Sequence, residues 1–380
     1  MPWDLSPREL AFAVILIACD AFGLVVGARL LARRSAPTGG FVRDGVIWLV
    51  FGIVWASIWG LGSVLALQSK FAMLRVITHV LLFVMAPLAV ARGFASIRLG
   101  HRTQGALPLA VGLAMVAVYS WAYFVEPRHI EFTEHRLQGP RIAALSGPVR
   151  IAILADIQTD EVGDYEVEVF RRTAELRPDL VLLPGDFVQT QTRQDFAEQA
   201  VRFRELFAVF EPWPRLGVFA VTGDIDPVPE LFDGTRVRVI DDQVVGFAGE
   251  PGLQLVGLGL PASRIRLGGR ALAAVEGFGG YSIVMGHAPD YAMPLIDGEV
   301  RGEMLCIAGH THGGQVVVPG LGPPITLTSV PRRFAAGGLF DCGDARLCIS
   351  RGIGLERGFA PRVRLFCRPQ VVVVDLVPEL

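Results

Sequence analysis

Two histidines separated by one residue, His310 and His312, stand in the glycine-rich segment 309–315. The apolar run 304–308 precedes this segment and the run 316–318 follows it, which predicts a strand, a turn and a second strand. Side chains two residues apart on an extended edge project to one side, and the flanking glycines allow an ion to approach closely. The pair therefore suits two neighbouring metal ions. The alternative is a polar turn with two solvated imidazoles.

Carboxylates or histidines also follow four other predicted strands. These strand ends are Asp156-Ile157-Gln158, Gly185-Asp186, Gly223-Asp224-Ile225-Asp226 and Gly286-His287. Ligand sites in α/β sheets form outside the carboxyl ends of the strands. Five such ends in succession predict one metal site and disfavour the solvated turn.

The elements that position these residues alternate along the second part of the chain. Apolar runs at 150–155, 180–183 and 218–221 read as buried strands, with helices expected at 161–176 and 194–210 between them. More strands are expected further on, at 253–258, 281–286, 304–308, 315–318, 346–350 and 371–376. This pattern predicts a layered α/β domain with a mixed sheet or two sheets.

The first third of the chain is apolar in a different way. Hydrophobic residues make up 52% of the 380-residue chain and charged residues only 19%, which is too apolar for an ordinary soluble protein. Four stretches approach the roughly 20 residues that a spanning helix needs, at 10–28, 46–67, 72–91 and 106–125. We therefore expect a transmembrane anchor with four spans over 1–126, a linker over 127–148 with one edge strand near 129–136, and the α/β domain over 149–380.

Charge indicates orientation and excludes one class of partner. The first and third loops carry the larger share of basic residues, namely Arg29, Arg33, Arg34, Arg43, Arg92, Arg98 and Arg102. The positive-inside rule places these loops in the cytoplasm, so four spans leave the α/β domain outside it. The net charge of −2 offers no basic field for nucleic acid.

The five cysteines show no zinc-binding spacing. Cys342 and Cys348 bracket a predicted hairpin, so they are either a disulfide or two buried thiols.

Several motifs of the second part resemble those of a known family. GHTHGGQVVVPGLG at 309–322, SRGIG at 350–354, and Pro361 with Arg362 look like the motifs of calcineurin-like metallophosphoesterases, specifically the membrane-attached bacterial branch. The resemblance runs from about Arg150 to the C-terminus. It implies a sandwich of two mixed sheets flanked by helices, in an integral membrane protein of a bacterial inner or cell membrane.

The resemblance also implies a role for each matching residue. Asp156 and His312 would hold one divalent metal, Asp186 would bridge two, and His287 and His310 would serve the second. Two metals that share a carboxylate activate a water and stabilise the developing phosphoryl charge.

Three positions depart from the family pattern. Gln158 replaces the second ligand histidine of DxH, Asp224 replaces the ligand asparagine, and Ile225 replaces the histidine that contacts the phosphate. Gln158 and Asp224 keep oxygen ligands, which favours Mn²⁺ or Mg²⁺ over Zn²⁺. An isoleucine can neither donate a proton nor bond an oxygen.

These features give two functional hypotheses. The first is a membrane-anchored binuclear-metal phosphoesterase acting on a phosphodiester or phosphomonoester, with a lipid or envelope substrate suggested by the tether to the bilayer. In it, Asp226 takes over part of the missing histidine's role, and Arg351 contacts the substrate phosphate or forms a structural salt bridge. The second is a metal-binding domain with weak or no turnover that serves in sensing or partner binding. Nothing in the sequence names a protein partner.

Overall fold

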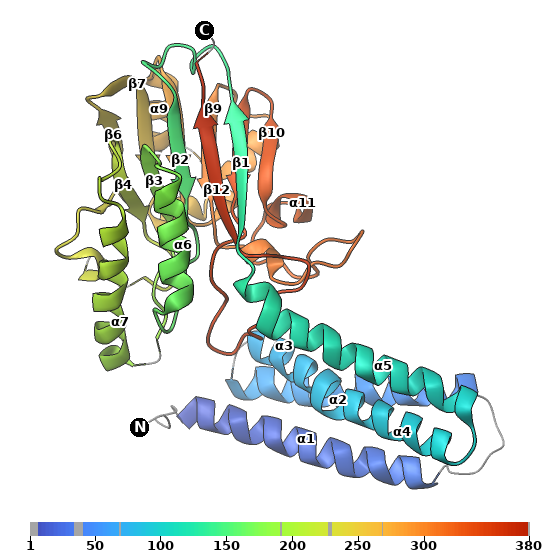
Figure 1. Ribbon diagram of the computed structural model, residues 1–380. Helices are drawn as coiled ribbons and strands as arrows, with labels where there is room; N and C mark the ends of the chain where they lie inside the picture. The colour runs from blue at the N-terminus through green and yellow to red at the C-terminus, as the bar shows by residue number, and fades with distance from the viewer. Residues whose placement is uncertain are drawn as a thin grey trace. The chain divides into compact units, whose positions relative to one another are not determined.

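The computed structural model describes residues 7–33, 41–67, 70–190, 192–226, 230–267 and 269–378. The chain forms two compact units. The helical unit comprises Met1–Tyr123 together with Arg357–Arg362, and the sheet unit comprises Phe124–Glu356 with Val363–Leu380. Figure 1 shows the elements of both units.

Long apolar helices form the helical unit. They are α1 (Pro7–Arg33), α2 (Phe41–Leu67), α3 (Lys70–His79), the π-helix η1 (Val80–Met85), α4 (Ala86–Arg98) and α5 (Arg102–Ser120). Phe12, Cys19, Trp55 and Val80 belong to their shared core, and Phe359 packs against it. Many other apolar side chains face outward, among them Ile17 and Leu65, as expected for a surface in contact with lipid.

Three helices among the described residues are long and apolar enough to cross a membrane, at Leu10–Arg29, Phe71–Arg98 and Arg102–Arg128. The prediction of apolar N-terminal helices compatible with a membrane anchor is confirmed, but the count of four spans is not. Within the expected span 46–67, the apolar helix segment is the shorter Val50–Leu65. Arg34, which was counted for orientation, lies outside the described residues.

Two six-stranded mixed sheets form the frame of the sheet unit. The first has the order β1-β12-β2-β3-β4-β5, with bounds β1 (Glu131–Leu137), β2 (Val149–Ile153), β3 (Leu180–Pro184), β4 (Gly217–Val221), β5 (Arg238–Val239) and β12 (Gln370–Leu376). The second has the order β10-β11-β9-β8-β7-β6, with bounds β6 (Val244–Phe247), β7 (Glu250–Gly257), β8 (Tyr281–Met285), β9 (Met304–Ala308), β10 (Gly338–Cys342) and β11 (Ala345–Ile349). Strands β2, β3, β4 and β5 run parallel to one another, and so do β7, β8, β9 and β11.

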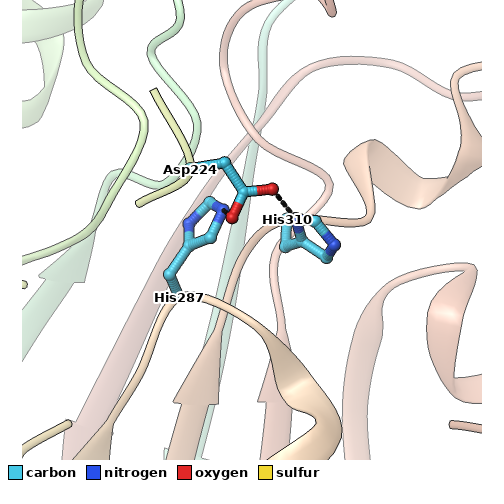
Figure 2. A group of neighbouring side chains, drawn as sticks. All are labelled: Asp224, His287 and His310. Atoms are coloured by element: carbon cyan, nitrogen blue, oxygen red, sulfur yellow. Dashed lines mark ion pairs between the residues drawn. The ribbon is translucent and has the colours of Figure 1, made fainter. Parts of the chain in front are cut away.

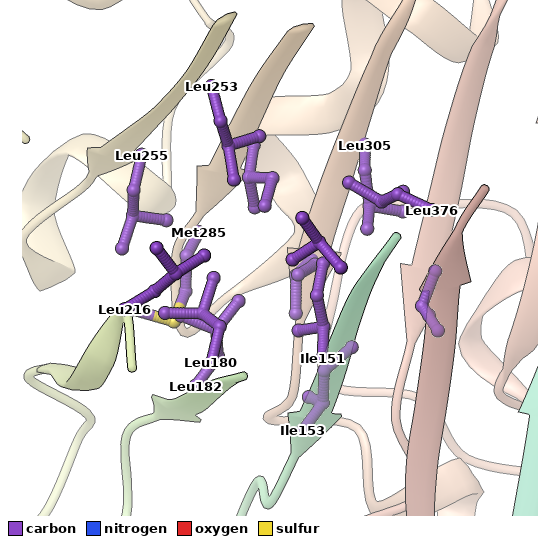
Figure 3. Packing of buried hydrophobic residues seen from close by; sticks show 14 of the residues in the cluster. Ile151, Ile153, Leu180, Leu182, Leu216, Leu253, Leu255, Met285, Leu305 and Leu376 are labelled. Atoms are coloured by element: carbon purple, nitrogen blue, oxygen red, sulfur yellow. The ribbon is translucent and has the colours of Figure 1, made fainter. Parts of the chain in front are cut away.

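The main core lies between the two sheets. Leu180, Leu182 and Ile151 of the first sheet face Leu255 and Met285 of the second (Figure 3). The alternate residues of the same strands point outward, because neighbouring side chains on a strand face opposite sides of a sheet.

Helices cover these outward faces. Helices α6 (Asp164–Glu175) and α7 (Arg193–Glu205) pack Phe170 and Phe203 on the first sheet (Figure 1). Residues of α10 (Met293–Ile296) and α11 (Arg332–Ala335) cover the second sheet. The prediction of two mixed sheets flanked by helices is confirmed.

Some local predictions differ from the structure. The segment 315–318 is not a strand: the backbone turns at Gln315, with φ 56°, and Val316 and Val318 form isolated bridges instead. By contrast, the edge strand expected near 129–136 is present as β1, at the edge of the first sheet. Cys342 and Cys348 are free thiols, and β10 and β11 pair Cys342 with Ala345 and Cys348 with Leu339. No disulfide joins them.

Candidate metal centre

Six of the predicted ligands meet at one edge of the sandwich. Asp156, Asp186 and Asp224 follow β2, β3 and β4 of the first sheet, and His287 and His310 follow β8 and β9 of the second. The carboxyl ends of these parallel strands converge, and the turn after β9 adds His312. The structure sorts the six residues into two groups of three whose ligand atoms lie within 4.8 Å of one another.

The first group contains Asp156, Asp186 and His312, all buried. The Asp156 Oδ1 atom accepts a hydrogen bond from the backbone N–H of His310 at 2.8 Å, so the β2 end and the histidine turn hold each other in place. His312 Nε2 lies 4.0 Å from Glu356 Oε2.

The second group contains Asp224, His287 and His310 (Figure 2). The two oxygens of Asp224 face His310 Nδ1 at 3.3 Å and His287 Nε2 at 3.9 Å. His287 Nδ1 lies 2.9 Å from the carbonyl oxygen of Pro184, which assigns the ring hydrogen to Nδ1 and makes Nε2 the ligand atom.

Asp186 lies between the two groups. One of its oxygens is 3.5 Å from His287 Nε2, although the residue belongs to the first group. A carboxylate in this place suits the bridging role that two divalent ions a few Å apart require.

The electrostatics of the site are those of a cation site. Burial, and then the charge of Asp186, raises the pKa of Asp156 well above its usual range. Burial, and then the charge of Asp224, raises the pKa of Asp186 to about 7. Burial lowers the pKa of His287 and of His310, so both rings are neutral and suited to bind metal.

Two buried polar atoms support the same reading. Asp156 Oδ2 and His287 Nε2 make no hydrogen bond within the described part of the chain. Buried polar atoms normally have a partner. Divalent ions held by carboxylate oxygens and imidazole nitrogens would supply these partners, so the residues present fit the metals that the motifs imply.

The backbone is strained at these positions. Nine non-glycine residues of the described chain have positive φ, and five of them are predicted ligands: Asp156, Gln158, Asp186, His310 and His312. Such strain clusters at functional sites. Gly223 is needed for space, because a Cβ there would lie 2.1 Å from Asp186 Oδ1.

Three further predicted residues make contacts of other kinds. The Gln158 amide nitrogen donates to Gln189 Oε1 at 2.9 Å. The Asp226 carboxylate accepts backbone N–H groups of Asp186, Phe187 and Gly223 at 2.7–2.8 Å, so it holds the ligand turns in place. The Arg351 Nη2 atom donates to Glu131 at 2.7 Å, which is the salt bridge considered as its alternative role.

Sequence reasoning missed three residues at this edge. Arg264 pairs with Asp224, Glu356 lies beside His312, and the buried Arg364 donates to backbone carbonyls of the site turns. The motifs within 350–364 indicate only weakly that Arg364 belongs to the site. Nothing in the sequence around Arg264 indicates its contact with Asp224.

A two-sheet sandwich with two carboxylate–histidine groups at the carboxyl ends of its strands offers positions for divalent metal ions of the kind that metal-dependent hydrolases use. No family model matches the chain. Known proteins do: an uncharacterized metallophosphoesterase of Bacillus subtilis, YkuE, is 25% identical over 75% of this chain and 96% of its own length. The phosphodiesterase YaeI of Escherichia coli is 28% identical over 70% of this chain and 96% of its own length.

A solved structure, the sulfate thiohydrolase SoxB of Thermus thermophilus, covers 60% of this chain and 56% of its own at 14% identity and a TM-score of 0.32, too low to bear on the fold. The relatives and the motifs agree: the chain is similar to metallophosphoesterases.

Proposed function

We propose that the protein is a metal-dependent phosphoesterase that hydrolyses phosphate esters at the edge where the two groups of ligands meet. The observation that carries this proposal is the position of Asp186 between the two groups. The names of the relatives, a phosphodiesterase among them, support it.

The ligand roles follow from the two groups. Asp156 and His312 would hold one ion, Asp224, His287 and His310 would hold the other, and Asp186 would serve both. When bound, the ions supply a nucleophilic water and a positive field for the phosphoryl oxygens. Three of the six residues in the donor set are carboxylates, with Asp224 in place of an amide ligand, and this favours Mn²⁺ or Mg²⁺ over Zn²⁺.

The remaining groups of the chain orient this machinery. Asp226 fixes the turns after β3 and β4, and its pKa, raised to about 7 by burial and then by Asp186, lets it hold a proton near neutral pH. Arg351 holds β1 against the site through its hydrogen bond to Glu131. We propose that it also contacts the substrate phosphate.

The experiment uses the full chain in detergent with Mn²⁺ and a nitrophenyl phosphodiester. We expect turnover, and a loss of at least about 100-fold in Asp186→Asn, because a bridging ligand is removed. Asp341→Asn, which changes an exposed carboxylate paired with Arg346, is the matched control. Equal rates for wild type and Asp186→Asn would remove the proposal.

A lipid-bearing ester is the proposed substrate class. The loop between η7 (His312–Gly314) and α11 exposes Leu321, Ile325 and Leu327. His310 Nε2 lies 3.3 Å from the carbonyl oxygen of Leu327, so this apolar loop borders the site. Phe366, 64% exposed, follows Leu365, which pairs with the same loop at Val317.

The substrate test compares a long-chain phospholipid with a short water-soluble diester. Leu321→Ser with Phe366→Ser should lower turnover of the phospholipid by at least about tenfold and leave the short diester unchanged, because burial of hydrocarbon is lost. Val244→Ser, an exposed valine on β6, is the control. Equal losses on both substrates contradict the lipid assignment.

For location, we propose a protein of a bacterial inner or cell membrane with four crossings, the second by α2, which continues over 27 residues. The basic first and third loops then place the sheet unit outside the cytoplasm. A reporter enzyme active only outside the cytoplasm, fused at the C-terminus, should be active. Activity of a cytoplasm-only reporter at the same place contradicts this orientation.

A second candidate function is a metal-bound domain with little turnover. Ile225 favours it: the residue donates its backbone N–H to Asp186 at 3.3 Å, and its side chain has no proton to give. Restoring the family pattern with Gln158→His, Asp224→Asn and Ile225→His separates the two. A gain in turnover of about 100-fold or more would favour the metal-bound domain with little turnover, since a general acid contributes about 10² to 10⁴ in rate.

A further inference from the structure

The site carries an additional negative charge at Asp224. Asp156 and Asp186 are already buried carboxylates, and Asp224 adds a third within reach of both histidines of its group (Figure 2). An ordinary amide ligand at this position would leave the site one charge less negative. A phosphate ester is an anion, so this extra negative charge weakens the attraction that the metal-loaded site exerts on it.

Arg264 faces that charge. It directly follows the short helix α8 (Leu260–Ser263), and its Nη2 atom lies 2.5 Å from Asp224 Oδ1. The Arg264 side chain is 51% exposed. Within the described chain its guanidinium donates no other hydrogen bond, so most of its donors face solvent at the rim of the metal site.

The other arginines close to the site are committed elsewhere. Arg364 is fully buried and donates to the carbonyl oxygens of Arg351, Gly352 and Gly354. Arg351 pairs with Glu131. Arg264, in contrast to these two arginines, has donors to offer a ligand at this rim.

The ion pair between Arg264 and Asp224 is not explained by its contribution to the stability of the fold. An ion pair this exposed contributes little to stability, because water screens the two charges. A guanidinium fork, however, matches the geometry of a phosphoryl group and can hold two of its oxygens.

We propose that Arg264 binds the phosphoryl group of the substrate; this inference rests on the proposed function. Arg264 would thereby replace the phosphate contact of the family's histidine, at whose position this chain has Ile225. In the resting site Arg264 neutralises Asp224. When the ester arrives, its oxygens take up the free donors of the same guanidinium beside the second group of ligands.

The test measures binding of inorganic phosphate to the full-length, Mn²⁺-loaded protein in detergent by calorimetry, together with steady-state kinetics. Arg264→Gln should weaken phosphate binding and raise KM by about 10- to 100-fold, because a charge-assisted hydrogen bond is lost. The value of kcat should change less than KM. Arg264→Lys, which keeps the charge, should recover part of the affinity.

Arg266→Gln is the matched control. Arg266 lies two residues away, is 48% exposed, and pairs with Asp297 and Glu299 instead of a predicted ligand. We expect its phosphate affinity and KM to equal those of the wild type. Calorimetric Mn²⁺ titration of the metal-free protein should give the same affinity for both glutamine variants to within about threefold, which shows that the ligands are intact.

The double variant Arg264→Gln with Asp224→Asn separates phosphate binding from simple charge neutralisation. If Arg264 binds phosphate, the double variant should still bind phosphate as weakly as Arg264→Gln does. Recovery of wild-type affinity in the double variant, or unchanged affinity in Arg264→Gln alone, overturns the inference. Absence of turnover in the wild type would remove the proposed function, while the phosphate titration would still decide this inference.

Discussion

At the scale of single residues, Asp186 joins the two halves of the site. Its carboxylate lies in the first group, 3.5 Å from a histidine of the second, and its backbone N–H is fixed by Asp226. Its pKa, raised to about 7 by burial and then by Asp224, means that without a cation the fold prefers a proton there.

A pH dependence of stability follows from Asp186. In the unfolded chain its pKa is about 4. Stability from this group is therefore fully present below about pH 4 and is lost as the pH rises through about 7. We expect metal-free protein to melt at a lower temperature at about pH 8 than at about pH 6, and saturating Mn²⁺ to remove most of the difference. Thermal melts with chelator and with Mn²⁺ check this; an equal pH slope in both contradicts it.

A steric prediction concerns Gly223. Gly223→Ala would place a Cβ 2.1 Å from Asp186 Oδ1 and 2.4 Å from Asp186 N. We expect a loss of about 1–3 kcal/mol in the free energy of unfolding, as for other overpacked sites, and weaker Mn²⁺ binding by calorimetry. Gly249→Ala, where nothing lies within 4 Å of the added Cβ, should match the wild type.

The ligand residues were predictable and Arg264 was not, for a physical reason. Asp156, Asp186, His287 and His310 each follow a buried strand, so local pattern and sheet geometry together bring them to one edge. Arg264 meets Asp224 across 40 residues, at the end of the four-residue helix α8, where no residue pattern indicates the contact. An exposed arginine is common on a protein surface and does not by itself indicate a site.

At the scale of elements, Arg364 ties the site turns together. The side chain is fully buried, and besides Arg351, Gly352 and Gly354 it donates to the carbonyl oxygen of Cys367 at 3.1 Å. Cys367 Sγ in turn lies 3.3 Å from the carbonyl oxygen of His312.

Replacing this arginine should damage the turns. Arg364→Met leaves several buried carbonyl groups without donors, each costing about 1–3 kcal/mol. We expect a loss of about 3 kcal/mol or more in denaturant unfolding. Arg368→Met, at an exposed arginine of the same segment, should stay within about 0.5 kcal/mol of the wild type. Equal stability of the two variants would show that the turns do not depend on Arg364.

Elements with strong apolar runs were predictable, and those set by turn geometry were not. The runs at 180–183 and 304–308 are strands β3 and β9, because buried strands need continuous apolar residues. The run 316–318 has the same composition, but the left-handed turn at Gln315 removes it from the sheet. Single backbone angles of this kind are not encoded in hydrophobic pattern.

At the scale of the whole molecule, the boundary of the sheet unit bears on the predicted linker. Strand β1 pairs in parallel with β12 along its full length. The backbone N–H of Cys367 donates to the carboxylate of Glu126 at 2.6 Å. Both contacts show that residues before 149 belong to the sheet unit, which begins at Phe124.

Two fragments test this boundary. Fragment 124–380 should stay monomeric and bind Mn²⁺, whereas fragment 149–380 should aggregate, because removing β1 exposes the edge of β12 with its four consecutive valines 371–374. Size-exclusion chromatography and light scattering measure the outcome. Equal behaviour of the two fragments would support the boundary at 149.

The left-handed backbone of the ligand turns also bears on how the site can change by mutation. Asp156, Asp186, His310 and His312 have positive φ, where β-branched residues are strongly disfavoured. Ile225 is not among the residues with positive φ, so this position accepts an isoleucine without backbone strain. Position 225 can therefore accept many side chains, whereas the strained ligand positions accept few. Position 225 is the position of choice for laboratory evolution of new chemistry at this centre.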